Sequence, residues 1–198
     1  MPTASSALAD WLDFLEALHP QGVAGIELGL ARVAAVKARL NQQVAETAPV
    51  ILVGGTNGKG SICAMLECTL LRAGYRVGLY TSPHLLHYNE RVRINGVAVE
   101  DELLTAAFSK VQAARGGAAL TYFEFGTLAA WEVFAAASVD VVILEVGLGG
   151  RLDATNVYDP ACAIVSTVDI DHTAFLGPDR EAIGFEKAGI FRPGVPAI

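Results

Sequence analysis

Hydrophobic positions recur along this chain with two different spacings, and the change of spacing predicts its elements. Apolar residues near every 3.6 positions predict two opening helices, over Ser6–Leu18 and Glu27–Leu40. Short continuous apolar runs instead predict buried strands. These runs cover Pro49–Val53, Arg76–Tyr80, Val139–Val146 and Ala161–Val168. Further helical spacings cover Ser61–Ala73, Glu100–Ala114, Phe123–Ala137 and Asp179–Lys187.

Strands that alternate with helices predict an α/β fold, a doubly wound and mainly parallel sheet. Between the second strand and the next helix, Thr81–Asn95 is predicted to be a loop, with a possible hairpin at the Asn95-Gly96 turn signal. The last residues, Arg192–Ile198, are typical of the approach to another strand. We therefore expect residues 1–198 to form one domain that is incomplete.

Composition and charge narrow the classes of protein. Of the 198 residues, 53% are hydrophobic, which is enough for one sizeable core. The net charge is −7 and no run of Lys or Arg occurs, so we expect no nucleic-acid partner. No apolar stretch reaches the roughly 18 residues of a membrane span, and Met1–Leu18 lacks the early basic residues of a secretory signal. Three cysteines without CxxC spacing indicate reduced thiols, so we expect a cytoplasmic protein.

A glycine-rich segment carries the strongest chemical signal. Gly54-Gly-Thr-Asn-Gly-Lys-Gly-Ser61 follows a predicted strand and opens a predicted helix, which is the context of a phosphate-binding loop. Its glycines let backbone N–H groups surround phosphate oxygens, and Lys59 would reach the outer phosphates. The spacing departs from the common GxxxxGK[ST] pattern, because Gly60 separates Lys59 from Ser61. The alternative is an ordinary glycine turn.

Polar residues that follow other strands are candidate metal ligands. Glu145 ends an apolar strand, as a Mg²⁺-binding carboxylate often does, although many strands end in Glu. Ser82 follows the second strand, in a segment that is otherwise an ordinary turn. His172 follows the fourth strand, with Asp169 and Asp171 as rival ligands and a structural histidine as the alternative. Since the carboxyl ends of parallel strands face one crevice, these groups are predicted to meet the phosphate loop there.

Seven motifs follow one another along the chain: Gly55-Thr-Asn-Gly-Lys-Gly-Ser61, Thr81-Ser-Pro-His-Leu85, Glu90-Arg-Val-Arg93, Phe123-Glu-Phe-Gly126, Glu145-Val-Gly-Leu-Gly-Gly-Arg-Leu-Asp-Ala-Thr-Asn156, Asp171-His172 and Glu186-Lys-Ala-Gly-Ile190. This ordered set is similar to that of the dihydrofolate/folylpolyglutamate synthase family of the Mur ligase superfamily. The resemblance runs from about residue 9 to the end of the chain.

The resemblance implies an ATP-dependent ligase that joins dihydropteroate, or a folate, to L-glutamate through an acyl phosphate. It implies ATP and two Mg²⁺ as cofactors, with Ser82, Glu145 and His172 as metal ligands and Glu145 bridging. It assigns the ATP phosphates to Gly55, Thr56, Asn57, Gly58, Lys59, Gly60 and Ser61. It assigns the pterin substrate to Thr121, Tyr122, Phe123, Glu124, Leu152, Asp153 and Ala154. Lys187 matches a lysine that the family carbamylates near the metal; the alternative is an ordinary surface lysine.

The resemblance also implies a second, C-terminal α/β domain that supplies the glutamate site, which we expect to be absent from this chain. An isolated fragment is then expected to be inactive, and the full-length protein to be a monomer. Two other functions stay open. Another Mur-type amino-acid ligase would share the phosphate loop but not the contexts of Ser82-Pro-His84 and Phe123-Glu-Phe125. A nucleotide switch would usually carry an Asn-Lys-x-Asp motif, which this sequence lacks.

Overall fold

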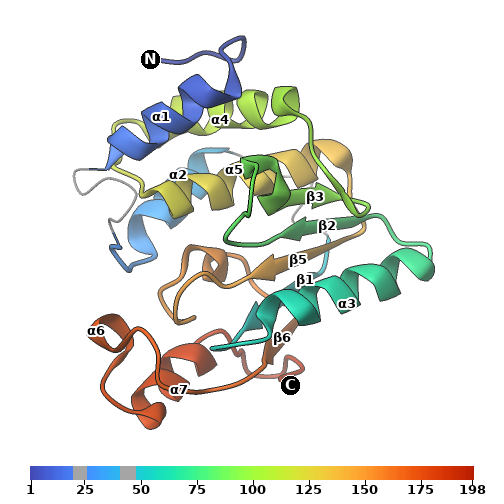
Figure 1. Ribbon diagram of the computed structural model, residues 1–198, viewed down its shortest axis with the longest axis vertical. Helices are drawn as coiled ribbons and strands as arrows, with labels where there is room; N and C mark the ends of the chain where they lie inside the picture. The colour runs from blue at the N-terminus through green and yellow to red at the C-terminus, as the bar shows by residue number, and fades with distance from the viewer. Residues whose placement is uncertain (20–25, 41–47) are drawn as a thin grey trace.

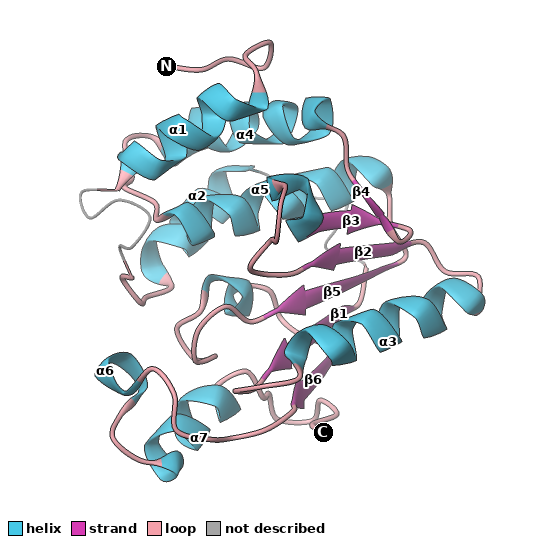
Figure 2. Ribbon diagram, in the orientation of Figure 1, coloured by secondary structure: helices cyan, strands magenta, loops and turns pink. Residues whose placement is uncertain are grey.

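Six strands form one sheet in the order β4-β3-β2-β5-β1-β6 in a computed structural model that describes residues 1–19, 26–40 and 48–198 (Figures 1 and 2). The strands are β1 (Val50–Gly54), β2 (Val77–Tyr80), β3 (Val92–Ile94), β4 (Val97–Ala98), β5 (Val141–Glu145) and β6 (Cys162–Val165). The four strands β2, β5, β1 and β6 are parallel, and the β3–β4 hairpin adds two antiparallel strands at one edge. This confirms the predicted doubly wound, mainly parallel sheet.

Helices cover both faces of this sheet (Figure 1). One face is covered by α3 (Lys59–Arg72), and the other by α5 (Tyr122–Ala137), on which α4 (Asp101–Arg115), α2 (Ala31–Leu40) and α1 (Leu8–Leu18) are layered. Near the C-terminus, α6 (Thr173–Leu176) and α7 (Arg180–Ala188) follow β6, and two short 3₁₀ helices cover Tyr88–Arg91 and Ala154–Val157. Within the described residues, no helix is both long and apolar enough to cross a membrane.

The central strand β5 explains why the core has two parts. Alternate side chains of a strand point to opposite faces. Val142 and Leu144 belong to the larger hydrophobic cluster under α5, whereas Val141 and Ile143 belong to the smaller cluster under α3. Both faces are therefore buried, which is why the sequence of β5 shows a continuous apolar run and no alternation.

The turn between β3 and β4 confirms the hairpin signal. Asn95 and Gly96 both adopt positive φ angles, of 53° and 82°, which is the geometry that an Asn-Gly hairpin turn requires. The Asn95 side chain also accepts a hydrogen bond from the Val77 N–H at 2.9 Å, which fixes the hairpin against the start of β2.

Most predicted elements agree with the structure, and the exceptions lie near the candidate site. The helix predicted over Glu27–Leu40 begins only at Ala31, because Gly29 has a positive φ of 157°, which is not helical, and its N–H bonds the Leu152 carbonyl at 3.3 Å. The short helix α6 was not predicted. Ala197 forms a parallel bridge to Ala163 in β6, as expected for a segment approaching another strand position.

Candidate functional site

The glycine-rich segment folds between β1 and α3 as the sequence predicts. Gly55 and Gly58 have φ angles of 139° and 83°, which favour glycine. A Cβ on Gly55 would lie 1.9 Å from the Ser166 Oγ, so the backbone passes too close to the end of β6 for any side chain. The N-terminus of α3 begins immediately afterwards, at Lys59, and its N–H groups give this end a partial positive charge.

Residues that follow β6 hold this loop in shape. The Thr56 N–H bonds the Thr167 carbonyl at 2.8 Å, and the Asn57 N–H bonds the Thr167 hydroxyl at 3.0 Å. The Ser166 hydroxyl donates to the Asn57 carbonyl at 2.6 Å. The loop is therefore preformed, and an anion that binds there need not order it first.

Lys59 lies back over the loop that precedes it. Its Nζ donates to the carbonyls of Gly55 at 3.0 Å and Thr56 at 3.3 Å. Both acceptors are neutral, so the ammonium charge is available to an anion bound above the loop. This arrangement suits a phosphate group.

The carboxylate of Glu145 lies beside the same helix terminus. Glu145 is buried, and its Oε2 accepts the Ser82 N–H at 3.1 Å. Its Oε1 is 3.9 Å from where a Cβ on Gly60 would sit. Burial raises the pKa of Glu145, and the Ser82 N–H and the Lys59 charge offset part of that rise. A bound divalent cation would also lower the pKa of Glu145, because it favours the ionised carboxylate.

His172 and its neighbours flank this carboxylate less closely. His172 is about half exposed, adopts a φ of 48°, and its Nε2 lies 3.5 Å from an Asp171 carboxylate oxygen. The rival ligand Asp169 is already paired, because its Oδ1 accepts Arg180 at 2.7 Å and the Ile170 N–H at 2.8 Å. Asp169 is therefore the weakest of the three candidates.

No group of three or more His, Cys, Asp or Glu side chains in the described part of the chain could hold a metal ion alone. The predicted set contains only one carboxylate, with a hydroxyl and an imidazole. That set fits Mg²⁺ bound together with a nucleotide, because Mg²⁺ is usually held by one or two carboxylates plus phosphate oxygens.

Lys187 is buried, which excludes the ordinary surface lysine considered above. Burial lowers its pKa, the positive charge of Lys59 lowers it further, and Asp171 opposes the change. Two contacts bring its helix to the site: the Arg151 N–H bonds the Glu186 carbonyl at 2.8 Å, and the Asn156 side chain bonds the Gly189 carbonyl at 3.1 Å. The long motif that starts at Glu145 thus positions Lys187.

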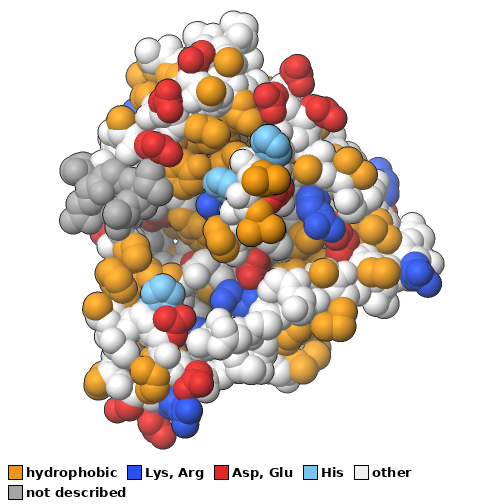
Figure 3. Space-filling model, viewed as in Figure 1, with side chains coloured by type: hydrophobic (Ala, Val, Ile, Leu, Met, Phe, Trp, Pro, Cys, Tyr) orange, Lys and Arg blue, Asp and Glu red, His pale blue; other side chains and the backbone are white. Residues whose placement is uncertain are grey.

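A cavity of about 320 Å³ opens next to these groups, between the helical layer and the α6 region. Figure 3 shows hydrophobic side chains gathered around a hollow on this face, with basic and His side chains at its lower rim. Ser82 and His172 line the cavity, so two of the three predicted metal ligands border it, and the third, Glu145, is bonded to Ser82. The other lining residues are Ile26, Glu27, Leu28, Pro83, Arg91, Thr121, Tyr122, Phe123, Glu124, Gly147, Leu148, Leu152, Asp153 and Ala154. All seven predicted substrate contacts are among them.

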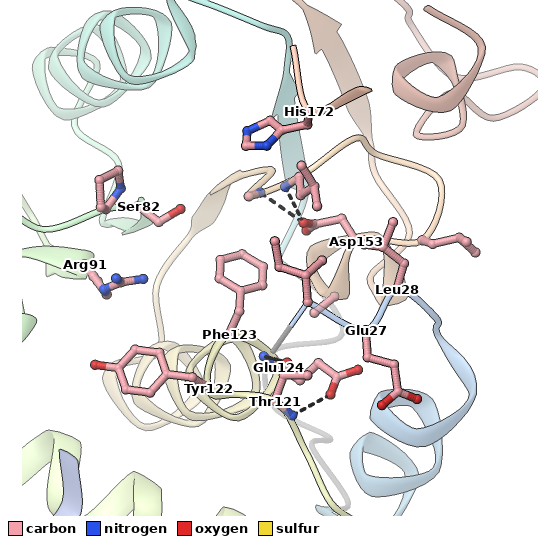
Figure 4. Close-up of a pocket in the computed structure, with 16 residues that line it drawn as sticks. Glu27, Leu28, Ser82, Arg91, Thr121, Tyr122, Phe123, Glu124, Asp153 and His172 are labelled. Carbon is pink, nitrogen blue, oxygen red and sulfur yellow. Dashed lines mark hydrogen bonds between the residues drawn. The ribbon is translucent and has the colours of Figure 1, made fainter. Parts of the chain in front are cut away.

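The ring of Phe123 extends into the cavity from the start of α5 (Figure 4). A Cβ on Gly147 would lie 2.7 Å from this ring, and the Tyr80 ring centroid is 5.7 Å from that of Phe123. Gly126, one turn further along α5, leaves space for the Tyr80 and Tyr88 hydroxyls. Residues of the Phe123-Glu-Phe-Gly126 motif therefore pack closely around the cavity.

Charge is distributed unevenly around this cavity. Three acidic side chains, Glu27, Glu124 and Asp153, line one end, and Arg91 lines the side near Ser82 (Figure 4). Both oxygens of Asp153 are engaged by N–H or hydroxyl groups of residues 147, 148 and 155, although burial raises its pKa. Glu124 differs, because its buried Oε1 has no hydrogen-bond partner among the described residues.

Two parts of this site were missed by the sequence analysis. Ile26–Leu28 line the cavity, although this segment was predicted to begin a helix. Gly29, which directly follows this segment, is the residue in the sequence that indicates a break before the helix. Arg91 lies in a recognised motif but was given no role; its Nε donates to the His84 Nδ1 at 2.7 Å, and burial and this guanidinium lower the pKa of His84.

Comparisons with known proteins show which family the chain is similar to. No protein-family model matches the chain. A dihydrofolate synthase/folylpolyglutamate synthase from Escherichia coli (strain K12) is 56% identical over all 198 residues, which are 46% of that protein. A second of the same name, from Haemophilus influenzae, is 54% identical over 98% of this chain and 44% of its own length.

Solved structures give the same result for the fold. E. coli FolC in complex with DHPP and ADP superposes with a TM-score of 0.94 at 55% identity, covering all of this chain and 47% of that one. A bifunctional folylpolyglutamate synthase/dihydrofolate synthase with Mn, AMPPNP and L-glutamate bound gives a TM-score of 0.90 at 53% identity, covering 99% of this chain and 47% of that one. The chain spans about half the length of the curated relatives it matches. The chain belongs to the dihydrofolate synthase/folylpolyglutamate synthase family and corresponds to the N-terminal portion of these relatives.

Proposed function

We propose that the protein is an ATP- and Mg²⁺-dependent ligase that joins the carboxylate of dihydropteroate, or of a folate, to the amine of L-glutamate. One observation supports this most strongly. Ser82 lines the ring-sized cavity and also bonds Glu145, which lies beside the phosphate loop. A carboxylate at the end of a ligand in the cavity would therefore lie close to a phosphate on the loop, as transfer between them requires.

The phosphate loop and Lys59 would hold the nucleotide. The backbone of Gly55–Ser61 and the N-terminus of α3 offer N–H groups and a partial positive charge to the phosphates. Lys59 would reduce the repulsion between the transferring phosphoryl group and the attacking carboxylate. Two relatives were solved with ADP and with AMPPNP, which supports ATP as the nucleotide.

Glu145, Ser82 and His172 would hold Mg²⁺, with Glu145 shared between two ions. Bound Mg²⁺ would neutralise phosphate charge during transfer. Within the described part of the chain, the buried carboxylate of Glu145 accepts one hydrogen bond, from the Ser82 N–H, and therefore has lone pairs left for a cation. A relative solved with Mn supports a divalent ion at this family's site. Lys187, buried near Lys59, would be carbamylated and so carry a negative charge toward the metal.

The cavity would take the pterin-bearing substrate. Phe123 offers a flat apolar surface, and Leu152 and Ala154 add further apolar surface to the lining. Thr121, Tyr122, Glu124 and Asp153 would supply the polar part of the same site. An E. coli relative was solved with DHPP, which supports a ligand of this class.

We further propose that the complete enzyme is a cytoplasmic monomer and that a second α/β domain supplies the glutamate site. Residues 1–198 would then be its N-terminal ATP-binding domain, unable to complete catalysis by itself. We propose no nucleic-acid or membrane partner.

Turnover by the complete protein tests this proposal. ADP release should require L-glutamate together with dihydropteroate or a reduced folate. A cell-wall nucleotide precursor with its own amino acid should give no ADP above background. ADP release with the cell-wall precursor alone would identify another Mur-type ligase, and phosphate release without any acceptor amine would indicate a nucleotide switch.

A further inference from the structure

Arg32, in the first turn of α2, lies outside the set of residues that line the cavity but bonds two of its walls. Its Nε donates to the Glu124 Oε2 at 2.8 Å. Its other two nitrogens donate to Glu27: one to the side-chain Oε1, and one to the backbone carbonyl at 2.6 Å. One guanidinium thus joins the loop Ile26–Leu28 to the start of α5, which are far apart in sequence.

The contact with Glu124 holds its carboxylate in one orientation at the start of α5. Glu124 Oε2 accepts both Arg32 and the Thr121 N–H, each at 2.8 Å, whereas the buried Oε1 has no partner among the described residues. With two donors on one oxygen, the side chain that lines the cavity is fixed between α2 and the N-terminus of α5.

The contact with Glu27 fixes the neighbouring wall segment, Ile26–Leu28. Glu27 is more than half exposed, and its carboxylate also lies 3.1 Å from the His19 Nε2. Hydrogen bonds from His19 and then Arg32 lower the pKa of Glu27. Arg32 bonds both the backbone and the side chain of Glu27, and the nearby Gly29 N–H bonds the Leu152 carbonyl. The segment Ile26–Leu28 is therefore tied to α2 on one side and to the Leu152 wall on the other.

We propose that Arg32 is a positioning residue for the ring-binding cavity: it acts through Glu124 and Glu27 to set the spacing of the two wall segments that carry them. This inference rests on the proposed function in one respect, because it takes the cavity to bind the ring of the substrate. A planar fork with several donors is needed for this role, and a lysine could satisfy only part of it.

Steady-state kinetics of the complete protein test the proposal with three variants. Arg32→Met keeps the aliphatic stem and removes every donor, and Arg32→Lys keeps the charge but not the fork. Arg39→Met is the matched control, since Arg39 lies on the same helix and, among the described residues, bonds the Ala114 and Arg115 carbonyls at 3.3 and 2.9 Å, away from the cavity lining. Circular dichroism and melting temperature confirm that each variant folds.

We expect Arg32→Met to raise the KM for dihydropteroate about tenfold or more, because small misplacements of binding groups are costly. The kcat and the KM for ATP should stay within about twofold, since the phosphate loop makes no contact with Arg32. Arg32→Lys should be intermediate and Arg39→Met should match the wild type. An unchanged KM for dihydropteroate, or equal changes in the KM for ATP, would overturn the proposal.

A double-mutant cycle shows whether Arg32 acts through Glu124. In a Glu124→Gln background, Arg32→Met should add much less to the KM than it does alone, because its main partner is already altered. Additive effects would contradict the proposal. If Arg32→Met fails to fold, Arg32→Lys in the same cycle decides the question by the same criterion.

Amide hydrogen exchange separates failure of this inference from failure of the proposed function. If the wild type does not turn over dihydropteroate, the proposed function fails, and exchange alone decides the role of Arg32. Arg32→Met should speed exchange at Thr121 and at residues 26–30, relative to Arg39→Met. Unchanged exchange at both segments would overturn the coupling.

Discussion

The phosphate loop and the ring-binding cavity lie next to each other but are built in different ways. The Lys59 ammonium bonds carbonyls three and four residues away, and backbone and hydroxyl groups of Ser166 and Thr167 hold the rest of the loop, so the loop is fixed mainly by bonds to its backbone. The cavity instead depends on side-chain pairs such as Arg32 and Glu124. The comparison teaches that changes to the loop should affect every substrate of the enzyme, whereas changes to the cavity should affect only the ring-bearing one.

The largest expected effect is that of Lys59→Ala on the complete enzyme. Loss of an electrostatic contact of this kind lowers turnover on the order of 10²-fold or more. ADP release should fall by this factor for every acceptor, with circular dichroism unchanged. Lys110→Ala, which removes an exposed lysine on α4 that pairs with Glu132, is the control. Near-normal turnover in Lys59→Ala would contradict the role of the loop.

Gly55→Ala should have the next largest effect, on both stability and nucleotide binding. The new Cβ would lie 1.9 Å from the Ser166 Oγ at a φ of 139°, so the loop or the end of β6 must move. We expect a loss of about 2 to 4 kcal/mol in the free energy of unfolding, measured by denaturant titration.

Gly58→Ala is the matched comparison, because its Cβ would be 3.9 Å from the nearest atom and only the φ of 83° is unfavourable. Its expected loss is about 1 kcal/mol. Equal losses in the two variants would show that crowding by Ser166 is not what constrains the loop.

Gly147→Ala tests whether a change in the cavity affects only the ring-bearing substrate. Its Cβ would lie 2.7 Å from the Phe123 ring and push that ring into the space for the ligand. We expect an increase of about tenfold in the KM for dihydropteroate, equivalent to about 1.4 kcal/mol. The KM for ATP should not change, and parallel changes in both constants would mean that the two regions are not independent.

The smallest effect is expected from Glu90→Gln, in the loop beyond Ser82. The Glu90 carboxylate accepts the N–H groups of Leu85, His87 and Leu86 at 2.7, 2.7 and 2.9 Å, and these bonds lower its pKa to about 2. A folded-state pKa below the ordinary value of 4.5 means that the ionised form favours folding. This stabilisation is complete above about pH 4.5 and is lost as the pH falls toward 2.

Melting temperatures across this range provide the measurement. The wild type should melt above Glu90→Gln at pH 7, and the difference should shrink steadily below pH 4.5. A difference that is constant from pH 7 to pH 3 would show that the charge of Glu90 is not its cause.

The elements that the sequence predicted well are those whose pattern is local. Continuous apolar runs identified β1, β2, β5 and β6, because a strand buried on both faces has no polar positions to interrupt it. The Asn95-Gly96 turn and the phosphate loop were predictable because only a few residue types tolerate their backbone angles. Since parallel strands share one edge, the sequence also predicted that Ser82 and Glu145 would meet, and they are hydrogen-bonded.

What the tertiary structure decided depends on partners that are distant in the chain. The segment Ile26–Leu28 has a helical hydrophobic spacing, yet it forms a cavity wall because Arg32 and Leu152 hold it extended. Lys187 has the sequence context of an exposed helix, yet contacts of its neighbours with Arg151 and Asn156 bury it beside the site. A local sequence pattern indicates the conformation that a segment prefers by itself. Which distant side chains contact that segment depends on tertiary packing.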